Sequence, residues 1–119
     1  MSVSPVYVDV ISKRPIVMEF TDFTTESNNS RLSPGGIGRV KGLHLSFSKE
    51  DPQQGLFLVS EALMVNEIRA AVYSLLLPSE LHFQLPAAPP GRYWLEVRTR
   101  LVPDEKLQVG RLQELLLIE

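Results

Sequence analysis

The sequence predicts an all-β sandwich from three observations. Apolar and polar residues alternate through Leu81–Leu101, in two runs separated by a proline-rich corner at Pro86–Gly91. Because successive side chains of a strand point to opposite faces, each run should be half buried. Nine prolines and seven glycines are spread along the 119 residues, which favours many turns and therefore many short strands. The length suits one domain, residues 1–119.

The alternation within Leu81–Leu101 assigns a core face and an outer face. The residues expected to point inward are Leu81, Phe83, Leu85, Tyr93, Leu95 and Val97. The residues expected to point outward after the corner are Trp94, Glu96, Arg98 and Arg100. A strand, a Pro/Gly corner and a second strand of the form Gly-x-Tyr-x-Leu-x-Val are typical of the late strands of immunoglobulin-like sandwiches. We therefore expect an immunoglobulin-like β-sandwich of about seven or eight strands.

The N-terminal part predicts two strands and a loop. Val3–Ile11 alternates valines with polar residues, and the prolines on either side of it suit an edge strand. Ile16–Phe20 forms a second short apolar run. Thr21–Pro34 is rich in Ser, Thr and Asn, which predicts a loop.

The middle of the chain predicts a strand, a turn and a buried strand. After Gly35-Gly36, four residues are expected in the core: Val40, Leu43, Leu45 and Phe47. Gly42 is expected to mark a bend or bulge that shifts the alternation. Lys49–Gly55 predicts a turn, and Leu56–Val59, apolar on both faces, predicts a central strand.

Glu61–Leu77 is ambiguous between helix and strand. Its Ala, Leu, Met and Glu residues favour a helix, and its apolar residues recur at helical spacing. As strands, it would turn at Asn66-Glu67 and place Ile68, Ala70 and Val72 on one face. We choose strand, because tertiary context often overrides local propensity.

The C-terminal segment Leu107–Glu119 is predicted to close the domain as a terminal strand. We expect it to pair with Tyr93–Arg100. Gly110 interrupts its pattern, which predicts a bulge.

Composition argues against several classes of function. The net charge is −2, with six basic and six acidic residues in residues 1–60 and six and eight in residues 61–119. A protein that depends on phosphate contacts normally shows a basic stripe, so we expect little direct DNA binding. The absence of cysteine excludes disulfides, thiolate catalysis and cysteine-ligated zinc. The chain shows neither a signal-peptide pattern nor a membrane-length apolar run, so we expect a cytoplasmic protein without membrane contact.

Motifs for chemistry are equally sparse. His44 and His82 are the only histidines and lie far apart in the sequence, so we expect two separate solvent-facing residues. No serine lies in a Gly-x-Ser-x-Gly turn, and the glycines of Gly36–Gly42 depart from dinucleotide-binding spacing. The sequence predicts no enzyme, no cofactor, no metal site and no small-molecule substrate.

The outward face of the late strand is the candidate binding site, with Trp94, Arg98 and Arg100 as its residues. An exposed tryptophan beside arginines can stack on a sugar or a base, or anchor a protein interface. Alternatively, neighbouring strands or a loop cover Trp94, and Glu96 and Arg98 form ordinary cross-strand ion pairs. Both interpretations stay open at this point.

Several short runs resemble a known family. They are Gly35-Gly36 followed by a strand and Gly42, Gly55-Leu-Phe-Leu, Leu77-Pro-Ser-Glu-Leu-x-Phe-x-Leu-Pro86, and Gly91-x-Tyr-x-Leu-Glu-Val-Arg-Thr99. From about Val6 onward, the chain resembles the immunoglobulin-like C-terminal domain of an uncharacterised bacterial family. In that family the domain usually follows a histone-like DNA-binding domain of the HU type. The shared residues are packing and turn residues, and no catalytic or ligand residues carry over.

The resemblance implies strand rather than helix at Ile68–Tyr73. It also implies a non-enzymatic interaction or accessory module of a nucleoid-associated, HU-like protein, with a protein partner or self-association. No HU-like segment is present in this chain. The alternative is a carbohydrate- or protein-binding sandwich domain of a surface protein, which a signal peptide in a longer reading frame would favour.

Overall fold

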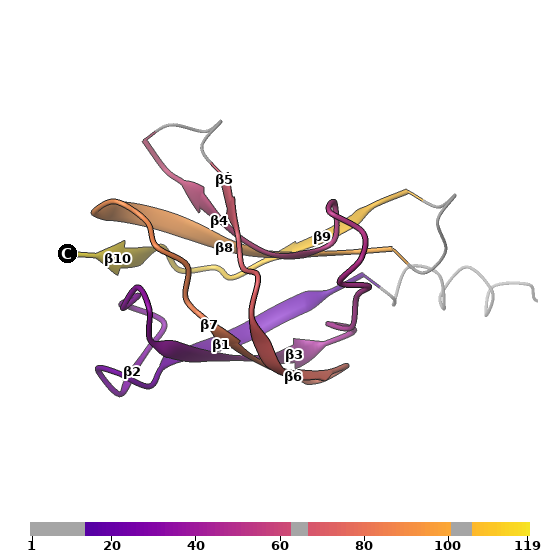
Figure 1. The fold of residues 1–119 in the computed structure, drawn as a ribbon, viewed down its shortest axis with the longest axis horizontal. Helices are drawn as coiled ribbons and strands as arrows, with labels where there is room; N and C mark the ends of the chain where they lie inside the picture. The colour runs from indigo at the N-terminus through magenta and orange to yellow at the C-terminus, as the bar shows by residue number, and fades with distance from the viewer. Residues whose placement is uncertain (1–13, 63–66, 101–105) are drawn as a thin grey trace, which may run out of the picture.

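The computed structural model describes residues 14–62, 67–100 and 106–119, and within these ranges the chain forms ten β-strands and no helix. The strands make two antiparallel five-stranded sheets, which face each other as the two layers of a sandwich (Figure 1). Sheet A has the order β2-β1-β3-β7-β6, with β1 (Ile16–Asp22), β2 (Ser27–Asn28), β3 (Ile37–Leu43), β6 (Tyr73–Leu77) and β7 (Glu80–Gln84). Sheet B contains β4 (Gly55–Ser60), β5 (Glu67–Arg69), β8 (Gly91–Thr99), β9 (Gln108–Arg111) and β10 (Leu116–Ile118).

The all-β sandwich is confirmed, but ten strands exceed the seven or eight predicted. The excess arises because two segments each contribute more strands than expected. Thr21–Pro34 contains the two-residue β2, and Leu107–Glu119 forms two strands, β9 and β10. The predicted strand at Val3–Ile11 lies outside the described residues.

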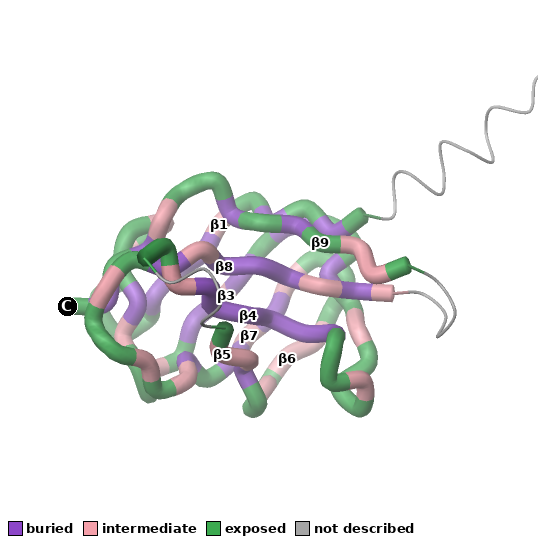
Figure 2. Tube along the Cα trace, turned by 90° about the horizontal axis from the view of Figure 1, so that it is seen from above, coloured by how far each residue is buried: buried purple, intermediate pink, exposed green. Residues whose placement is uncertain are grey.

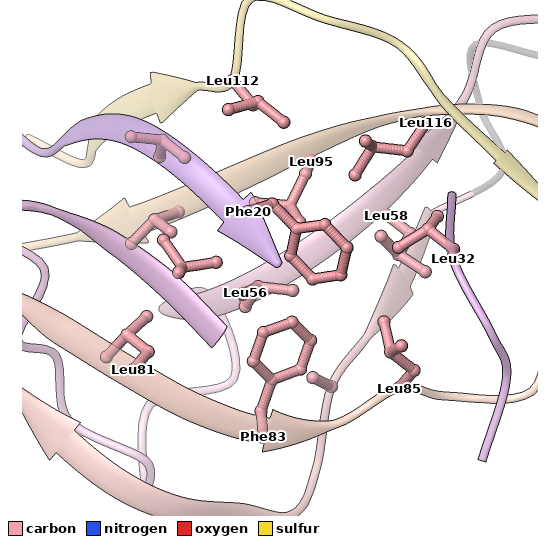
Figure 3. Packing of buried hydrophobic residues seen from close by; sticks show 14 of the residues in the cluster. Phe20, Leu32, Leu56, Leu58, Leu81, Phe83, Leu85, Leu95, Leu112 and Leu116 are labelled. Carbon is pink, nitrogen blue, oxygen red and sulfur yellow. The ribbon is translucent and has the colours of Figure 1, made fainter. Parts of the chain in front are cut away.

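The core lies between the two sheets and is made of their inward-facing side chains. All six residues predicted for it from Leu81–Leu101 are buried, with at most 3% of their surface exposed. Phe20 of β1 and Phe83 of β7 approach each other at its centre, with ring centroids 6.1 Å apart (Figure 3). Leu56 and Leu58 of β4 are fully buried, as expected of a central strand.

β8 organises sheet B, because it is paired along both edges. β4 lies along one edge, from Gly55 opposite Arg98 to Ser60 opposite Tyr93. On the other edge, β10 pairs with Gly91–Tyr93 and β9 pairs with Glu96–Thr99. The predicted pairing of the C-terminal segment with β8 is therefore confirmed, with an interruption between β9 and β10. Figure 2 shows β8 and β4 as largely buried tubes in the middle of the sandwich.

Gly42 and Gly110 are not bulges, and the bulge prediction is wrong for both. Gly110 pairs in register with Val97, and the register shift of β1 and β3 lies between Val17 and Glu19 of β1. Both glycines instead allow a close approach of the chain. A Cβ on Gly42 would lie 1.9 Å from the carbonyl oxygen of Ile16, and one on Gly110 would lie 2.0 Å from that of Pro15.

Three of the four core residues predicted around β3 pack inward: Val40, Leu45 and Phe47. The fourth, Leu43, is 48% exposed, so its assignment to the core is wrong. The alternation of β3 continues through Gly42 and changes only at His44, which takes a left-handed conformation with φ of 57°. This turn brings Leu45 inward, and Leu43 consequently stays on the outer face.

The described part of Glu61–Leu77 contains the strands β5 and β6 and no helix, so the choice of strand over helix is confirmed. The segment pairs with β4 as β5, then crosses to sheet A and continues as β6. Tyr73 stabilises this crossing, because its hydroxyl accepts a hydrogen bond from Leu56 N at 3.1 Å and donates one to Ala70 O at 3.0 Å. The common inward face expected for Ile68, Ala70 and Val72 is wrong, because Ala70 is buried and Val72, at the crossing, is 57% exposed.

The predicted loop at Thr21–Pro34 is held by side-chain hydrogen bonds. Asp22, at the end of β1, is fully buried and accepts from the hydroxyl of Ser33 at 2.6 Å and from that of Thr25 at 3.0 Å. Asn29 accepts from Phe20 N at 2.8 Å. The loop therefore attaches to the end of sheet A at several points.

Replacing Tyr93 by alanine should reduce the free energy of unfolding by ~3–5 kcal/mol, the usual effect of deleting a buried aromatic side chain. Tyr93→Phe should cost about 1 kcal/mol, because only one hydrogen bond is lost. That bond runs from the Tyr93 hydroxyl to Pro89 O at 2.5 Å, like the tyrosine corner of immunoglobulin-like domains. Urea denaturation checks both values, and equal losses for the two variants would contradict the assigned packing of the ring.

Gly110→Ala should destabilise the domain by at least about 1–3 kcal/mol, because the new methyl group meets backbone that cannot move aside easily. Gly36→Ala is the matched control. Its Cβ would approach chiefly the hydroxyl of Thr24, an exposed side chain that can rotate away, and would lie 3.2 Å from the backbone carbonyl oxygen of Ser33, a much milder contact than the one at Gly110. Thermal unfolding of both variants makes the comparison, and a Gly110→Ala protein as stable as the control would show that Pro15 does not lie against β9.

Candidate functional site

The predicted binding residues belong to the outer face of sheet B and to its end. Trp94 and Arg98 of β8 point away from the core, on the same side as Glu96. The register places Phe57 of β4 on one side of Glu96 and Arg111 of β9 on the other. The structure therefore brings side chains from β4, β8 and β9 together on this face.

Glu96 is the centre of the face and is only 5% exposed. One of its carboxylate oxygens accepts from Arg98 Nε at 3.2 Å and Nη2 at 2.9 Å. The other oxygen accepts from Arg111 Nε at 2.8 Å and is also bonded by Arg111 Nη2. A buried carboxylate is stable only when it is paired and hydrogen-bonded, so the two arginines are required to keep Glu96 in place.

Arg98 joins this carboxylate to a second one and covers an aromatic ring. Its Nη1 and Nη2 donate to the two oxygens of Glu67 on β5, at 3.1 and 2.7 Å. Its guanidinium lies 4.0 Å from the ring centroid of Phe57, which is only 6% exposed although it faces outward. Arg98 therefore contributes a cation–π contact, two ion pairs and shielding of apolar surface.

Arg100 lies beyond the end of β8 and does not share this network. Its Nε donates to Asp51 Oδ2 at 3.1 Å, its Nη2 bonds to Gln53, and its backbone N donates to Gln54 Oε1 at 3.0 Å. Only 15% of its side-chain surface is exposed. Arg100 thus ties the turn before β4 to the end of β8.

Trp94 is half-buried, beside Val59 of β4. The guanidinium of Arg111 lies 4.7 Å from its ring centroid, while the same guanidinium binds Glu96. One part of the ring is therefore occupied by a neighbouring cation. The outer face carries aromatic surface and arginines together, and Arg98 and Arg111 there each contact a carboxylate. Arg69 of β5 instead donates to the backbone carbonyls of Lys49, Asp51 and Gln54, and Arg92 at the start of β8 is exposed.

These contacts shift the ionisation of the groups involved. Hydrogen bonds from Arg98 lower the pKa of Glu67 below its ordinary value of 4.5, and the bonds to Glu67 raise the pKa of Arg98. The pKa of Asp51 is lowered chiefly by the backbone N–H of Gln53, then by the side chain of Gln54 and by Arg100. The charged forms of all three groups are stabilised by neighbours within the domain.

Glu67, Asp51 and Phe57 also belong to this arrangement, although the sequence pattern did not indicate them. All three lie on other strands or turns, so their proximity depends on the pairing of β4 with β5 and β8. The alternation of residues along Leu107–Glu119 does indicate that the side chain of Arg111 points outward. The register that sets it opposite Glu96 comes only from the fold.

The two histidines occupy different settings. His44 is exposed after β3, as predicted, whereas His82 of β7 is half-buried and pairs with Glu80, Nε2 to Oε2, at 2.6 Å. In the described ranges, no three His, Asp or Glu side chains gather closely enough to hold a metal ion. The described part of the chain also has no helix of the length and hydropathy that crosses a membrane.

A hollow of about 500 Å³ lies between the first residues of β1 and the strand β9. Its charged lining consists of Arg14, Arg111 and Glu114, and the remainder is Gln113 together with apolar residues of β1, β9 and the segment before β1. Arg111 is already bound to Glu96. This lining contains no pair of groups suited to acid–base or nucleophilic chemistry.

The lowered pKa of Glu67 predicts a pH-dependent contribution to stability. Because its pKa is lower in the folded than in the unfolded state, the stabilisation is complete above about pH 4.5 and disappears as the pH falls through the folded pKa. Urea denaturation from about pH 7 to about pH 3 should therefore show the wild type and Glu67→Gln converging at acid pH. Glu114→Gln removes a charge at an exposed position as the control. Parallel curves for wild type and Glu67→Gln would contradict the role of the Arg98 contact.

Comparison with known proteins supports the fold. Residues 16–111 match the family model described as "Domain of unknown function (DUF4469) with IG-like fold". The chain also resembles the crystal structure of a "Putative bacterial DNA binding protein" from Bacteroides vulgatus ATCC 8482, with a TM-score of 0.72 and 22% sequence identity. That alignment covers 87% of this chain and 47% of the other, so this chain spans about half the length of that protein.

No curated protein matches the sequence. At 22% identity, the structural likeness shows the fold alone. The family model covers most of the chain and agrees with the strands observed in both sheets. The chain therefore belongs to this family of immunoglobulin-like domains of unknown function.

Proposed function

We propose that this domain is a non-enzymatic interaction module of a DNA-binding protein, and that it contributes little direct contact with DNA. One observation carries the proposal: Arg98, Arg100 and Arg111 are each ion-paired with a carboxylate of the domain itself. They are three of the arginines that a nucleic acid could contact on the outer side and end of sheet B, and Arg69 and Arg92 there have no ion pair within the described residues. The charges of Arg98, Arg100 and Arg111 stabilise contacts within the domain.

Binding of phosphate at this face would require these ion pairs to open. Release of Arg98 and Arg111 would leave the carboxylate of Glu96 buried without its partners, which is costly. Non-specific affinity for DNA comes from neutralising phosphates with several Lys and Arg side chains. A face on which Arg98 and Arg111 are already neutralised offers less of that energy.

The structural relative supports the association with DNA-binding proteins. It is described as a "Putative bacterial DNA binding protein", and this chain aligns with less than half of its length. We infer that the sandwich and the DNA-binding segment are separate parts of a longer protein. The DNA-binding segment would be of the HU type, and the protein would act in the cytoplasm at the nucleoid.

The non-enzymatic part of the proposal rests on the lack of an assembled reaction centre in the described residues. The pair of Glu80 and His82 is the closest approach to one. The His82 ring lies edge-on to Phe23, with centroids 5.9 Å apart, and no described hydroxyl is hydrogen-bonded to it. An acid–histidine pair without a nucleophile does not complete a catalytic triad.

The 119-residue chain should bind duplex DNA weakly, with a shallow dependence on salt. The expected dissociation constant is weaker than about 10⁻⁴ M at moderate salt, the weak end of non-specific binding. Fluorescence anisotropy with a labelled duplex at low and moderate salt measures both quantities.

A Glu67→Gln variant sharpens this experiment, because it releases Arg98 from one of its carboxylates. Its binding to DNA should be equal to or slightly stronger than that of the wild type. Micromolar or tighter binding by the wild type, with a steep salt slope, would show that the arginines are a nucleic-acid site and would overturn the proposed function.

A further inference from the structure

The outer face of sheet A carries an arginine in a setting unlike that of sheet B. Arg39 lies on β3, with Thr21 of β1 on one side and His82 of β7 on the other. In the described part of the chain, no carboxylate oxygen lies within 4.0 Å of its guanidinium. Arg39 therefore has no described carboxylate in direct contact, unlike Arg98, Arg100 and Arg111, although it lies near enough to Glu80 to help lower the pKa of that carboxyl after the larger effects of His82 and Lys41.

The contacts that Arg39 does make are weak. Its Nη2 donates to the hydroxyl of Thr21 at 3.4 Å, a long hydrogen bond, and that hydroxyl donates in turn to Asn28 Oδ1 at 2.7 Å. Its Nε is buried and has no hydrogen-bond partner in the described residues. A buried donor without an acceptor is unfavourable, so a ligand that draws the guanidinium into a complete set of hydrogen bonds would gain from it.

Apolar side chains frame this guanidinium. Arg39 Cζ lies 5.6 Å from the ring centroid of Phe23, which is 42% exposed. Ile37, two residues before Arg39 on the same face of β3, is 41% exposed. Exposed apolar residues continue along this sheet toward the other end of its outer face: Ile16, Leu43 and Leu77. A cation between exposed aromatic and aliphatic side chains is typical of the residues that anchor protein interfaces.

We propose that Arg39, Phe23 and Ile37 form a site that binds a carboxylate side chain of a protein partner, flanked in that partner by aliphatic residues. The guanidinium pairs with the carboxylate through charge-assisted hydrogen bonds, and the two apolar side chains pack against the aliphatic neighbours. This inference rests on the proposed function and names the chemistry that the interaction module recognises.

The neighbouring charges favour a single carboxylate over a run of phosphates. Lys41, the next outward residue of β3, stands between Glu19 of β1 and Glu80 of β7 in the cross-strand register. Glu80 also pairs with His82. A polyanion that reached Arg39 would meet both carboxylates, and it would gain nothing from burying Phe23 and Ile37.

The test uses the 119-residue chain and two short peptides, acetyl-Leu-Glu-Leu-amide and its glutamine counterpart. Nuclear magnetic resonance would follow the Nε–H signal of Arg39 and the methyl groups of Ile37 during each titration. The glutamate peptide should shift both signals, with a dissociation constant on the order of 1 mM for so small a ligand. The glutamine peptide should bind at least about tenfold more weakly, because it lacks the charge.

The substitution Arg39→Gln should weaken the glutamate peptide by a similar factor, and Arg39→Lys should restore part of the affinity. Arg92→Gln is the matched control, since Arg92 is an exposed arginine at the start of β8 in the other sheet. The control should bind like the wild type. Backbone spectra of every variant verify that it is folded.

Three outcomes would overturn the inference: equal binding of the two peptides, unchanged binding by Arg39→Gln, or no shift at Arg39 up to about 10 mM peptide, roughly ten times the expected dissociation constant. Inorganic phosphate and duplex DNA serve as competing probes. A larger shift at Arg39 with either one would assign the site to phosphate instead of a protein carboxylate. The salt-dependent DNA titration tests the proposed function separately. If the peptides do not bind as expected while DNA binding is weak, only the inference about Arg39 is overturned.

Discussion

The pairing of β8 along both of its edges is the constraint on which sheet B depends. β4 occupies one edge, and β9 and β10 share the other. The inward residues Tyr93, Leu95 and Val97 are thereby held in the core between the sheets. Their outward neighbours must then lie between the side chains of β4 and β9, with little access to water. The carboxylate of Glu96 is stable in this buried position only because arginines on two strands neutralise its charge.

Arg98 on the outer face of sheet B and Arg39 on that of sheet A have different surroundings, and this contrast supports the functional proposals. On sheet B, Arg98 forms ion pairs with Glu67 and Glu96 and packs over the ring of Phe57, which it shields from water. On sheet A, Arg39 has no described carboxylate partner and lies beside exposed apolar surface. A charge that stabilises the fold is poorly available to a ligand, whereas a charge without a direct ion pair, among apolar side chains, gains from a partner.

Local patterning was sufficient for the elements whose strand faces alternate clearly. Leu81–Leu85 and Tyr93–Val97 were assigned correctly because one face of each strand is buried and the other is not. Glu61–Leu77 was harder, because helix propensity and sheet context disagree there. The strand hydrogen bonds to β4 and β7 prevail, and the chain changes sheets between Arg69 and Tyr73, which no periodic pattern reveals.

By itself, the sequence determined the all-β class, the central core residues and the outward direction of Trp94 and Arg98, because these depend on the two-residue period of a strand. Tertiary structure alone decided which groups meet. The close approach of Pro15 and Ile16 to Gly110 and Gly42 turns two apparent bulges into sites where a side chain has no room. The partnership of Arg98 with Glu67, and the lack of one for Arg39, follow from strand register and from the crossing between sheets. These contacts join residues far apart in the sequence, so the local pattern of one strand does not predict which carboxylate will lie opposite its arginines.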